Sequence, residues 1–531
     1  MEDIKEILLA HGYSYDFLNR NLTCENLING DNAWALKNSL NEAYILFIQK
    51  EAEVEFEILN WIISNYPMVG MIVRYYNAKI LNIRIKRFYD NSFIFLNELE
   101  IAKYTQMPKS LLFGNKQKGY KALQPIETSI ENLFFEAHSI VRDIDGLHPE
   151  EALDEICKFI YVKLYDEEIN PKSGAQFIQR ALYCTTEEAA SIVRSLYKES
   201  TKYDERVYAL RIPKYKKSRG VFDSNINLSS PALCKLIEVF ECYDLTNSNI
   251  DVKGRAFQKM LLPAARAGMG QYFTPLPVIK FIVDVLSPNI DDLIIDPFSG
   301  SGHFLTQTIS YVSLNENVSE KKMHEFKFYK LHGIEKSEKM VRISMTDMRL
   351  HGDGHSNIRC TDALLNFDNY EDLKENSFDL VMSNPPFGSI LSHEAIERLG
   401  SFELMHGRKN APLEILGLER CIQLLRPGGR FGIVLPESIF TNRNTKYVRD
   451  WLLKKVNIFG IIGLPLETFS PFGANIKTVI LFGKKRKYGQ IENKIETVVI
   501  GSVKSVGYNF KGQPTPLCDI DTIIPALKKY I

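Results

Sequence analysis

The spacing of apolar residues predicts a doubly wound α/β sheet in the second half of the chain. From about residue 250 onward, short apolar runs alternate with segments of helical spacing, which is the pattern of strands connected by helices. Gly and Pro residues follow several of the runs and mark their ends. The predicted strands are Leu293–Ile295, Tyr329–Ile334, Asn357–Cys360, Phe378–Met382, Arg430–Leu435, Phe459–Leu464 and Thr478–Phe482.

The first half of the chain shows two other patterns. In residues 1–125, apolar and polar residues alternate over Ile80–Lys86, which indicates a half-exposed strand, and Phe93–Leu96 is its expected neighbour. Residues 126–250 have helical spacing instead, and one stretch forms a single apolar stripe. That stripe consists of Leu153, Ile156, Cys157, Ile160, Tyr161 and Leu164.

These patterns predict four regions. We expect an α+β region of unknown role at 1–125, a helical domain at 126–250, an α/β domain at 251–485 and a C-terminal tail at 486–531. A chain of 531 residues is too long for one compact domain, which agrees with this division.

Composition adds few constraints. A hydrophobic content of 45% and a charged content of 24% are ordinary for a soluble globular protein. The formal net charge of zero argues only against a protein that coats nucleic acid by bulk charge. The eight cysteines include no CxxC pair, so we expect reduced thiols and no metal site. Without a signal peptide or a membrane-spanning stretch, a cytoplasmic protein with no membrane contact is expected.

The first candidate site consists of Asn384, Pro385, Pro386 and Phe387, which follow an apolar run. The prolines end the strand, so Asn384 lies at its carboxyl end, where open α/β sheets place their chemistry. The Asn384 side-chain oxygen and the Pro385 carbonyl can both accept hydrogen bonds from one exocyclic amino group. Phe387 can stack on the ring that carries this group. By themselves, the four residues are equally compatible with a proline turn after a core strand.

The second candidate site is the stretch Asp296–Phe304, which follows the first strand and leads into a helix. Glycines at this turn let a ligand approach the backbone, and the helix N-terminus favours a carboxylate. A GxG spacing alone is weak evidence, and phosphate binding would be its usual interpretation. Two acidic residues at later strand ends change that interpretation.

Glu335 closes the second strand, where a carboxylate can accept hydrogen bonds from ribose hydroxyls. Asp362 follows the third strand, where it can accept from an adenine amino group. Each residue alone is more often a solvated loop carboxylate. As an ordered set, the acidic residues fit a cofactor that has adenine, ribose and a charged amino acid but no phosphate. We therefore expect S-adenosyl-L-methionine, with Asp296 holding its ammonium group.

These motifs resemble those of a known enzyme class. Asp296–Phe304 and Asn384–Phe387 resemble the cofactor and catalytic motifs of amino-group DNA methyltransferases, in the order of the gamma group of adenine-N6 enzymes. Gly270–Pro275 is similar to the segment that covers the cofactor in that group. Further stretches resemble the modification subunits of type I restriction–modification systems, over roughly residues 130 to 485. These stretches are His138–Asp166, Arg430–Pro436 and Thr468–Thr478.

The resemblance implies a fold and a set of site residues. The fold would be a Rossmann-like class I S-adenosylmethionine-dependent methyltransferase sheet, with an N-terminal helical domain and an additional small α+β region. The catalytic residues would be Asn384, Pro385, Pro386 and Phe387, with no metal. The cofactor-binding residues would be Tyr272, Phe273, Thr274, Pro275, Asp296, Phe298, Ser299, Gly300, Gly302, Glu335, Asp362 and Asn384.

The implied activity is site-specific methylation of adenine N6 in double-stranded DNA. Both N6 protons would bond to the Asn384 oxygen and the Pro385 carbonyl while the base is flipped out of the helix. Asn in place of Ser before the prolines favours adenine N6 over cytosine N4, and the Pro-Cys pair of cytosine-C5 enzymes is absent. Two alternatives remain open. One is a protein glutamine methyltransferase, which usually has Tyr where Phe387 stands, and the other is a non-catalytic DNA-binding scaffold in a defence complex.

The resemblance also implies partners. Fewer than fifty residues follow Phe482 and no long insertion interrupts the predicted sheet, so little room is left for a DNA-recognition domain. We expect a separate specificity subunit and a second methyltransferase copy, docked through the helical domain, with a restriction subunit as a further candidate. The sequence gives neither the DNA site nor the role of residues 1–125.

Overall fold

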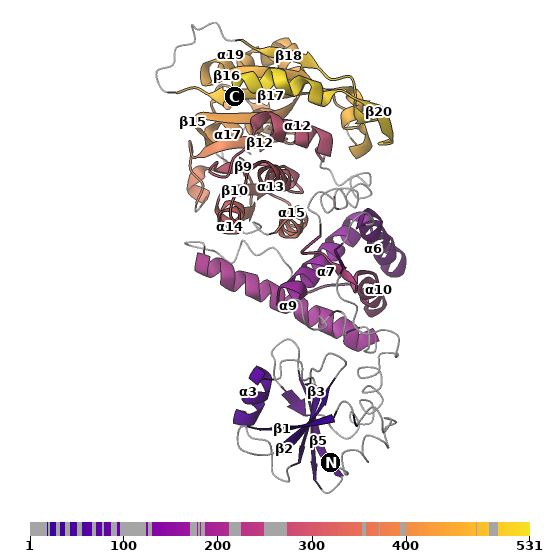
Figure 1. Ribbon diagram of the computed structural model, residues 1–531. Coiled ribbons are helices and arrows are strands. Elements are labelled where there is room, and N and C mark those ends of the chain that lie inside the picture. Colours follow the sequence, from indigo (N-terminus) through magenta and orange to yellow (C-terminus); the bar gives the residue numbers. More distant parts are fainter. Residues whose placement is uncertain are drawn as a thin grey trace. The chain divides into compact units, whose positions relative to one another are not determined.

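The computed structural model describes most of the chain after residue 130 and the main elements before it (Figure 1). None of the helices in these ranges is both long and apolar enough to cross a membrane. Apart from isolated residues, the described ranges are 22–27, 32–37, 43–49, 56–65, 71–76, 79–86, 93–95, 124–125, 130–169, 186–211, 225–248, 273–352, 357–370, 372–392, 401–473, 475–487 and 497–531.

The chain divides into two compact units. One comprises Met1–Gln124, Tyr165–Glu199 and Leu228–Tyr243, and the other comprises Pro125–Leu164, Ser200–Asn227 and Asp244–Ile531. Two helices, α7 (Pro149–Ile169) and α9 (Thr186–Arg211), each contribute residues to both units. The division between Gln124 and Pro125 coincides with the boundary expected at residue 125, and that between Tyr243 and Asp244 lies near the one expected at 250. The expected helical domain is itself divided between the two units, and no division falls at residue 485.

The first unit contains a six-stranded sheet in the order β1-β2-β3-β4-β5-β6. All neighbours are antiparallel except β3 and β4, which are parallel and connected by helix α3. The expected pairing of the strand near residue 80 with the segment at residue 93 is confirmed. The elements are β1 (Leu22–Asn26), β2 (Asn32–Lys37), β3 (Ala43–Gln49), α3 (Phe56–Asn65), β4 (Met71–Tyr76), β5 (Lys79–Lys86) and β6 (Phe93–Phe95).

The same unit contains the first part of α9 and helix α10 (Ser230–Phe240). The Ser229 hydroxyl caps α10 by accepting a hydrogen bond from the Ala232 amide, which satisfies one of the free N–H groups at the helix start. Ser230 Oγ donates to Glu187 of α9 over 2.7 Å. The two helices are therefore joined by a side-chain hydrogen bond at their N-terminal ends.

The second unit contains an eight-stranded sheet in the order β11-β10-β9-β12-β15-β17-β16-β18. Only β17 runs antiparallel to its neighbours. All seven strands predicted from the sequence are present, with ends shifted by a few residues. The strands are β9 (Ile294–Asp296), β10 (Leu331–Glu335), β11 (Ile358–Cys360), β12 (Phe378–Ser383), β15 (Leu425–Pro436), β16 (Val456–Gly463), β17 (Thr478–Lys485) and β18 (Val499–Ser502).

Apolar cores cover both faces of this sheet, since successive strand residues point to opposite sides. Ile294 packs with the helices of one face, and Ile295 packs with those of the other. The first face carries α12 (Leu276–Leu286), α13 (His303–Asn315), α14 (Glu320–Tyr329) and α15 (Glu338–Leu350). The second carries α17 (Leu413–Leu424) and α19 (Lys446–Lys455). Figure 1 shows the strands between these helices.

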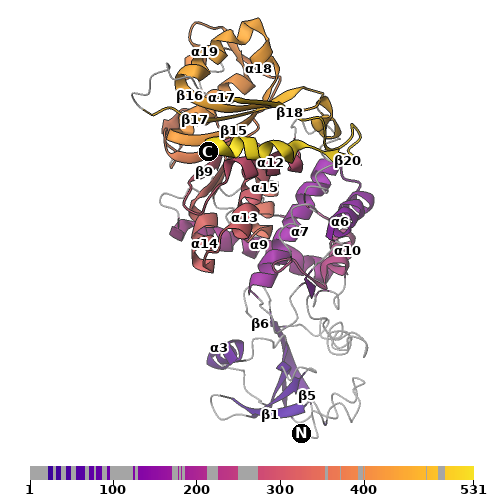
Figure 2. The same ribbon diagram turned by 45° about the horizontal axis from the view of Figure 1, so that its top comes forward.

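The segment after residue 485 is part of this unit's core. It adds β18 to the edge of the sheet and then forms β19 (Val506–Tyr508), β20 (Pro514–Cys518) and α20 (Ile524–Leu527). Val506 and Leu527 are buried in the same cluster as the residues of α12, and Figure 2 shows this C-terminal segment beside α12. The segment that the sequence pattern suggested to be a tail is therefore part of the folded unit.

Helices α6 (Ile130–Asp145) and α7 are separated by a short turn at Gly146, which has a positive φ of 66°. The predicted apolar stripe lies on α7, but the helix is buried on nearly all sides from Ala152 to Asp166. Its charged residues are buried with the apolar ones. Burying an unpaired charge costs several kcal/mol, so each of these charges requires a partner.

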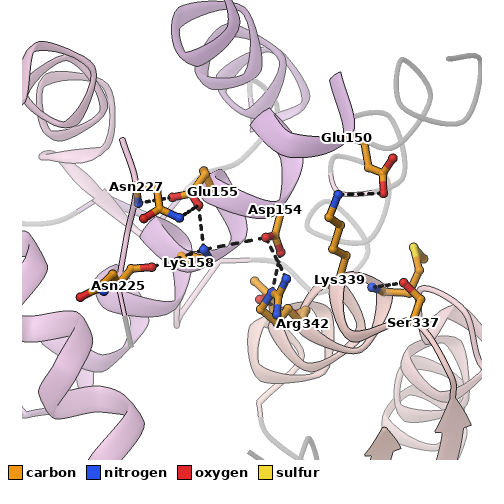
Figure 3. Close-up of polar contacts among 11 residues, drawn as sticks. Glu150, Asp154, Glu155, Lys158, Asn225, Asn227, Ser337, Lys339 and Arg342 are labelled. Carbon is orange, nitrogen blue, oxygen red and sulfur yellow. Dashed lines mark hydrogen bonds and ion pairs between the residues drawn. The ribbon is translucent and has the colours of Figure 1, made fainter. Parts of the chain in front are cut away.

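The partners lie mainly on α15 and on the chain before α10 (Figure 3). Asp154 accepts two hydrogen bonds from Arg342, over 2.7 Å from Nε and 3.0 Å from Nη2. Lys158 Nζ donates to Glu155 over 2.7 Å, and Glu155 also accepts from the backbone N–H of Asn227 over 2.8 Å. A two-pronged arginine–carboxylate pair fixes both position and angle. The pair of Asp154 and Arg342 therefore sets how α7 lies against α15.

Replacing Asp154 with Ala should destabilise the protein by about 3–5 kcal/mol, because the buried Arg342 would lose both of its hydrogen bonds to the Asp154 carboxylate. Urea unfolding followed by circular dichroism would measure this loss. The double variant D154L/R342M should recover most of the stability, since it buries apolar groups instead of two charges.

A matched control removes an exposed ion pair of similar length. Glu238 and Lys235 are 2.6 Å apart on α10, with both side chains about half exposed. E238A should change stability far less than D154A. Equal losses in the two variants would show that burial of the Asp154–Arg342 pair does not matter.

Candidate active site

The site lies where the strand order of the large sheet reverses. From β9 the chain continues to β10 and β11 on one side and then returns to β12 on the other. Open α/β sheets bind ligands in the crevice that forms at the carboxyl ends of the strands at such a point. Asp296 ends β9, and Asn384 directly follows β12. The two motifs found in the sequence therefore meet at this crevice.

A pocket is present at this position. Most of its lining was expected from the sequence. Ser301, His303 and Phe304 belong to the candidate stretch Asp296–Phe304, although the expected set of cofactor-binding residues did not include them. Ile279 was not expected, because its pattern is that of an ordinary core residue of a helix. The complete lining is Phe273, Thr274, Ile279, Asp296, Phe298, Ser299, Gly300, Ser301, His303, Phe304 and Asn384.

Asp296 is a buried carboxyl group. Its Oδ1 accepts hydrogen bonds from Ser383 Oγ over 2.5 Å and from the Phe298 amide over 3.1 Å. Burial raises the pKa of Asp296 to about 7, while these two hydrogen bonds lower it and the nearby charge of Glu335 raises it further. A carboxyl group that titrates near neutral pH in a pocket is a functional-site candidate, because a cationic ligand would favour its ionised form.

The turn after Asp296 requires glycine at its end. Gly302 has a φ of 82° and precedes α13, and a Cβ atom there would collide with Ser344 Oγ of α15. The turn is held from outside by the Ser299 amide, which donates to the Ile334 carbonyl over 2.9 Å. Within it, Ser301 Oγ lies 2.8 Å from His303 Nδ1. The N-terminus of α13 therefore approaches the pocket closely.

Glu335 and Asp362 lie at the ends of the next two strands but do not line the pocket. Glu335 is buried and accepts hydrogen bonds from the amides of Gly300, over 3.1 Å, and Ser337, over 2.7 Å. Asp362 accepts from Lys336 Nζ over 2.9 Å and from the Leu364 amide over 3.0 Å. Glu335 thus holds the turn that lines the pocket, and Asp362 lies one strand further out.

Asn384 has one side-chain group bound and one left without a partner. Its Nδ2 donates to Thr274 Oγ1 over 3.0 Å. Its Oδ1 is shielded from solvent and accepts no hydrogen bond from the residues that the structure describes. An unsatisfied buried acceptor costs about 1–3 kcal/mol, so such an atom in a pocket indicates a missing donor.

The three residues after Asn384 have different environments. Pro385 is buried against α17, where a Cβ at Gly417 would lie only 2.7 Å from the Pro385 Cβ. Pro386 is exposed. The Phe387 ring is only 8% exposed and belongs to the core cluster that includes α12. Stacking of Phe387 on a bound base therefore stays a prediction. It requires one face of the buried ring to be accessible to the base.

Of the remaining expected residues, Pro275 does not line the pocket. Pro275 is the residue before α12 and has extended backbone angles. Tyr272, like Gly270 and Gln271, lies outside the described residues.

Arg420 of α17 is a residue that the sequence analysis missed. It is fully buried and donates hydrogen bonds to the carbonyls of Leu364, over 3.2 Å, and Leu365, over 2.8 Å, just after Asp362. Its guanidinium also lies 4.3 Å from the centre of the Phe367 ring. Arg420 thereby fixes the loop that carries Asp362. Among the described residues, no cluster of three or more His, Cys, Asp or Glu side chains could hold a metal ion.

Curated proteins with similar sequences include type I methylase subunits and a type II restriction enzyme and methyltransferase, RM.BcgI from Heyndrickxia coagulans, which is 25% identical over 239 residues, covering 44% of this chain and 35% of that protein. The methylase subunit of type I restriction enzyme EcoEI from Escherichia coli is 29% identical over 235 residues, which cover 44% of this chain and 46% of that protein. The StySJI methylase subunit from Salmonella typhimurium is 27% identical over 267 residues, covering 48% and 49%. This chain therefore spans about half the length of these two methylase subunits.

Solved structures share the fold of this chain. A chain from a study of complex assembly and conformational transition of the type I restriction–modification system has a TM-score of 0.55 and 19% identity. The match covers 76% of this chain and 83% of that one. A type I methyltransferase subunit from Streptococcus thermophilus has a TM-score of 0.51 and 18% identity, covering 76% and 93%. The predicted class I S-adenosylmethionine-dependent methyltransferase fold is confirmed.

The family assignment follows from a match to the family model described as N-6 DNA Methylase. The match extends over residues 248–519, a little more than half of this chain, and includes both candidate motifs. It confirms the resemblance seen in the motifs. This protein therefore belongs to the N-6 DNA methylase family.

Proposed function

We propose that this protein methylates the N6 amino group of adenine in double-stranded DNA, with S-adenosylmethionine as the methyl donor. The observation that carries the proposal is the buried Asn384 Oδ1, which lies in the pocket without a donor. An exocyclic amino group is a donor of the right kind to satisfy it. Membership of the N-6 DNA methylase family supports the same chemistry.

The pocket residues fit the proposed cofactor. Asp296 offers a buried carboxyl group for an ammonium group, and the N-terminus of α13 at His303, which lines the pocket, favours a ligand carboxylate. Glu335 and Asp362, at the next two strand ends, would accept hydrogen bonds from the ribose and the adenine. When bound, the cofactor supplies a methyl group activated for direct transfer.

The residues of this chain would act by position and by fixed dipoles. Asn384 Oδ1 and the Pro385 carbonyl would accept both protons of the target amino group, which raises the electron density of the nitrogen lone pair. Correct orientation and preorganised acceptors are the main sources of acceleration in such a reaction. The target atom lies inside the duplex, so the base must be flipped into the pocket, where Phe387 is the proposed stacking partner.

We further propose that DNA-sequence recognition requires a separate specificity subunit, bound by two copies of this chain. The support is that several curated relatives, such as those of EcoEI and StySJI, are named as methylase subunits of type I restriction enzymes. A restriction subunit would join the same assembly. The helical region of residues 126–250 is the proposed docking region, as the resemblance to modification subunits implies.

Replacing Asp296 with Asn should change how stability depends on pH. The folded-state pKa of about 7 lies above the usual value of 3.8, so the folded state holds its proton more tightly than the unfolded state. Between these two pH values the wild type should lose stability as pH rises, by a total on the order of 4 kcal/mol. D296N, which cannot ionise, should lack this loss and be the more stable protein at pH 8.

Denaturant unfolding of wild type and D296N from pH 4 to pH 8 would measure the difference. D291N, which changes an exposed Asp near the same strand, is the matched control and should follow the wild-type pH dependence. A constant difference between D296N and wild type across this range would contradict the buried, titrating carboxyl group.

Replacing Asn384 with Ala should abolish methyl transfer and leave cofactor binding intact. Loss of one preorganised hydrogen-bonding group in an active site typically costs about 10²–10³ in rate. Calorimetry with S-adenosylmethionine should give an affinity close to that of wild type, because Asn384 acts on the target base. E335A should instead weaken cofactor binding. N315A, an exposed Asn on α13, is the control.

The modified base identifies the substrate. DNA from cells that express the native complex should contain N6-methyladenine at a defined site, and no N4-methylcytosine. Methylcytosine, transfer to a protein glutamine, or no transfer at all would each overturn the proposed activity. The last two outcomes correspond to a protein methyltransferase and to a non-catalytic scaffold.

The purified single chain should bind S-adenosylmethionine but methylate DNA poorly and without site preference. Addition of its specificity subunit should restore methylation at the mapped site, in a complex of two methyltransferase chains and one specificity subunit by light scattering. Efficient site-specific methylation by the single chain would refute the partner proposal and move recognition into this chain.

A further inference from the structure

We infer that Thr274 is a positioning residue that fixes which end of the Asn384 amide faces the target base. The inference rests on the proposed function and deepens it. The observed contact is the hydrogen bond from Asn384 Nδ2 to Thr274 Oγ1, over 3.0 Å. Both residues line the same pocket.

Orientation matters because the two ends of an amide have the same shape and opposite hydrogen-bonding character. Oδ1 accepts hydrogen bonds, and Nδ2 only donates them. A half-turn of the side chain would direct the two Nδ2 protons at an amino group that also donates. Only one of the two orientations can therefore bind the target amino group and raise its nucleophilicity.

The backbone of Asn384 is already fixed from both sides. Ser383, which is fully buried, donates to Asp296 over 2.5 Å, and Pro385 is buried against Gly417. The conformational freedom that remains is rotation of the Asn384 side chain. Among the described residues, Thr274 is the hydrogen-bond partner recorded for that side chain, and it binds the nitrogen end.

Thr274 is suited to select the nitrogen end. A hydroxyl group donates one hydrogen bond and accepts two. The Thr274 side chain lies in a pocket that would hold a ligand carboxylate, so its proton has an acceptor there. With that proton engaged, Oγ1 can only accept, and the amide nitrogen is the end that can donate to it. Asn384 Oδ1 then stays directed at the target.

The first test is a double-mutant cycle on methylation of the mapped duplex by the native complex. T274V should lower kcat by about 10–100-fold, with T274S close to wild type, because misplaced catalytic groups cost rates of this order. In an N384D background both carboxylate oxygens accept, so orientation no longer matters. There T274V should cost no more than about threefold. T274A is a second variant, which should behave like T274V.

The second test uses binding instead of activity. With S-adenosylhomocysteine bound, which carries the carboxylate but no transferable methyl group, the wild-type complex should bind a duplex with the target adenine more tightly than one with purine, which lacks the 6-amino group. T274V should lose this preference and bind the purine duplex as wild type does. A purely structural role for Thr274 would weaken binding to both duplexes together.

The outcomes separate this inference from the proposed function. A wild-type complex that methylates no adenine would refute the proposed function. With an active wild type, equal costs of T274V in the wild-type and N384D backgrounds would refute the role of Thr274 alone. Unchanged kcat in both T274V and T274A would also refute the role of Thr274.

Discussion

One buried hydrogen bond, from Ser383 Oγ to Asp296 Oδ1, joins the two halves of the site. Asp296 ends the strand that leads into the glycine-rich turn, and Ser383 ends the strand that leads into Asn384. These strands are direct neighbours and run parallel, so their carboxyl ends are adjacent only in this register. The cofactor turn and the proposed catalytic amide therefore depend on the same contact for their relative position.

The site combines two groups whose burial is unfavourable until a ligand arrives. Asp296 has a raised pKa because its charge is poorly solvated, and Asn384 Oδ1 is buried without a donor. Each costs stability in the empty protein. Such costs persist where the surrounding structure fixes the groups firmly, and here the sheet and the α17 contact at Gly417 do so. A ligand with one ammonium group and a base with one amino group would relieve both.

Much of the catalytic unit could be predicted because its determinants are local. Buried parallel strands such as β12 need uninterrupted apolar runs, and polar residues that directly follow them, such as Asn384, lie at the ligand-binding edge. Arg420 and Gly417 could not be found in this way. Their roles come from contacts with Leu364 and Pro385, which are distant in sequence. Burial of the Phe387 ring and the pairing of β18 with β16 also depend on tertiary packing.

The charged contact between α7 and α15 has a consequence for how this protein can diverge. Asp154 and Arg342 are 188 positions apart, yet they form a buried pair of opposite charges. A lineage that loses Asp154 first leaves the buried Arg342 without its two-pronged carboxylate, and one that loses Arg342 first leaves Asp154 with the longer ion pair to Lys158, over 3.8 Å. Selection would act against either state. Substitutions at the two positions are therefore expected to occur together or not at all. The substitution rate at this position of α7 would then be tied to that of α15, a helix that packs on the sheet.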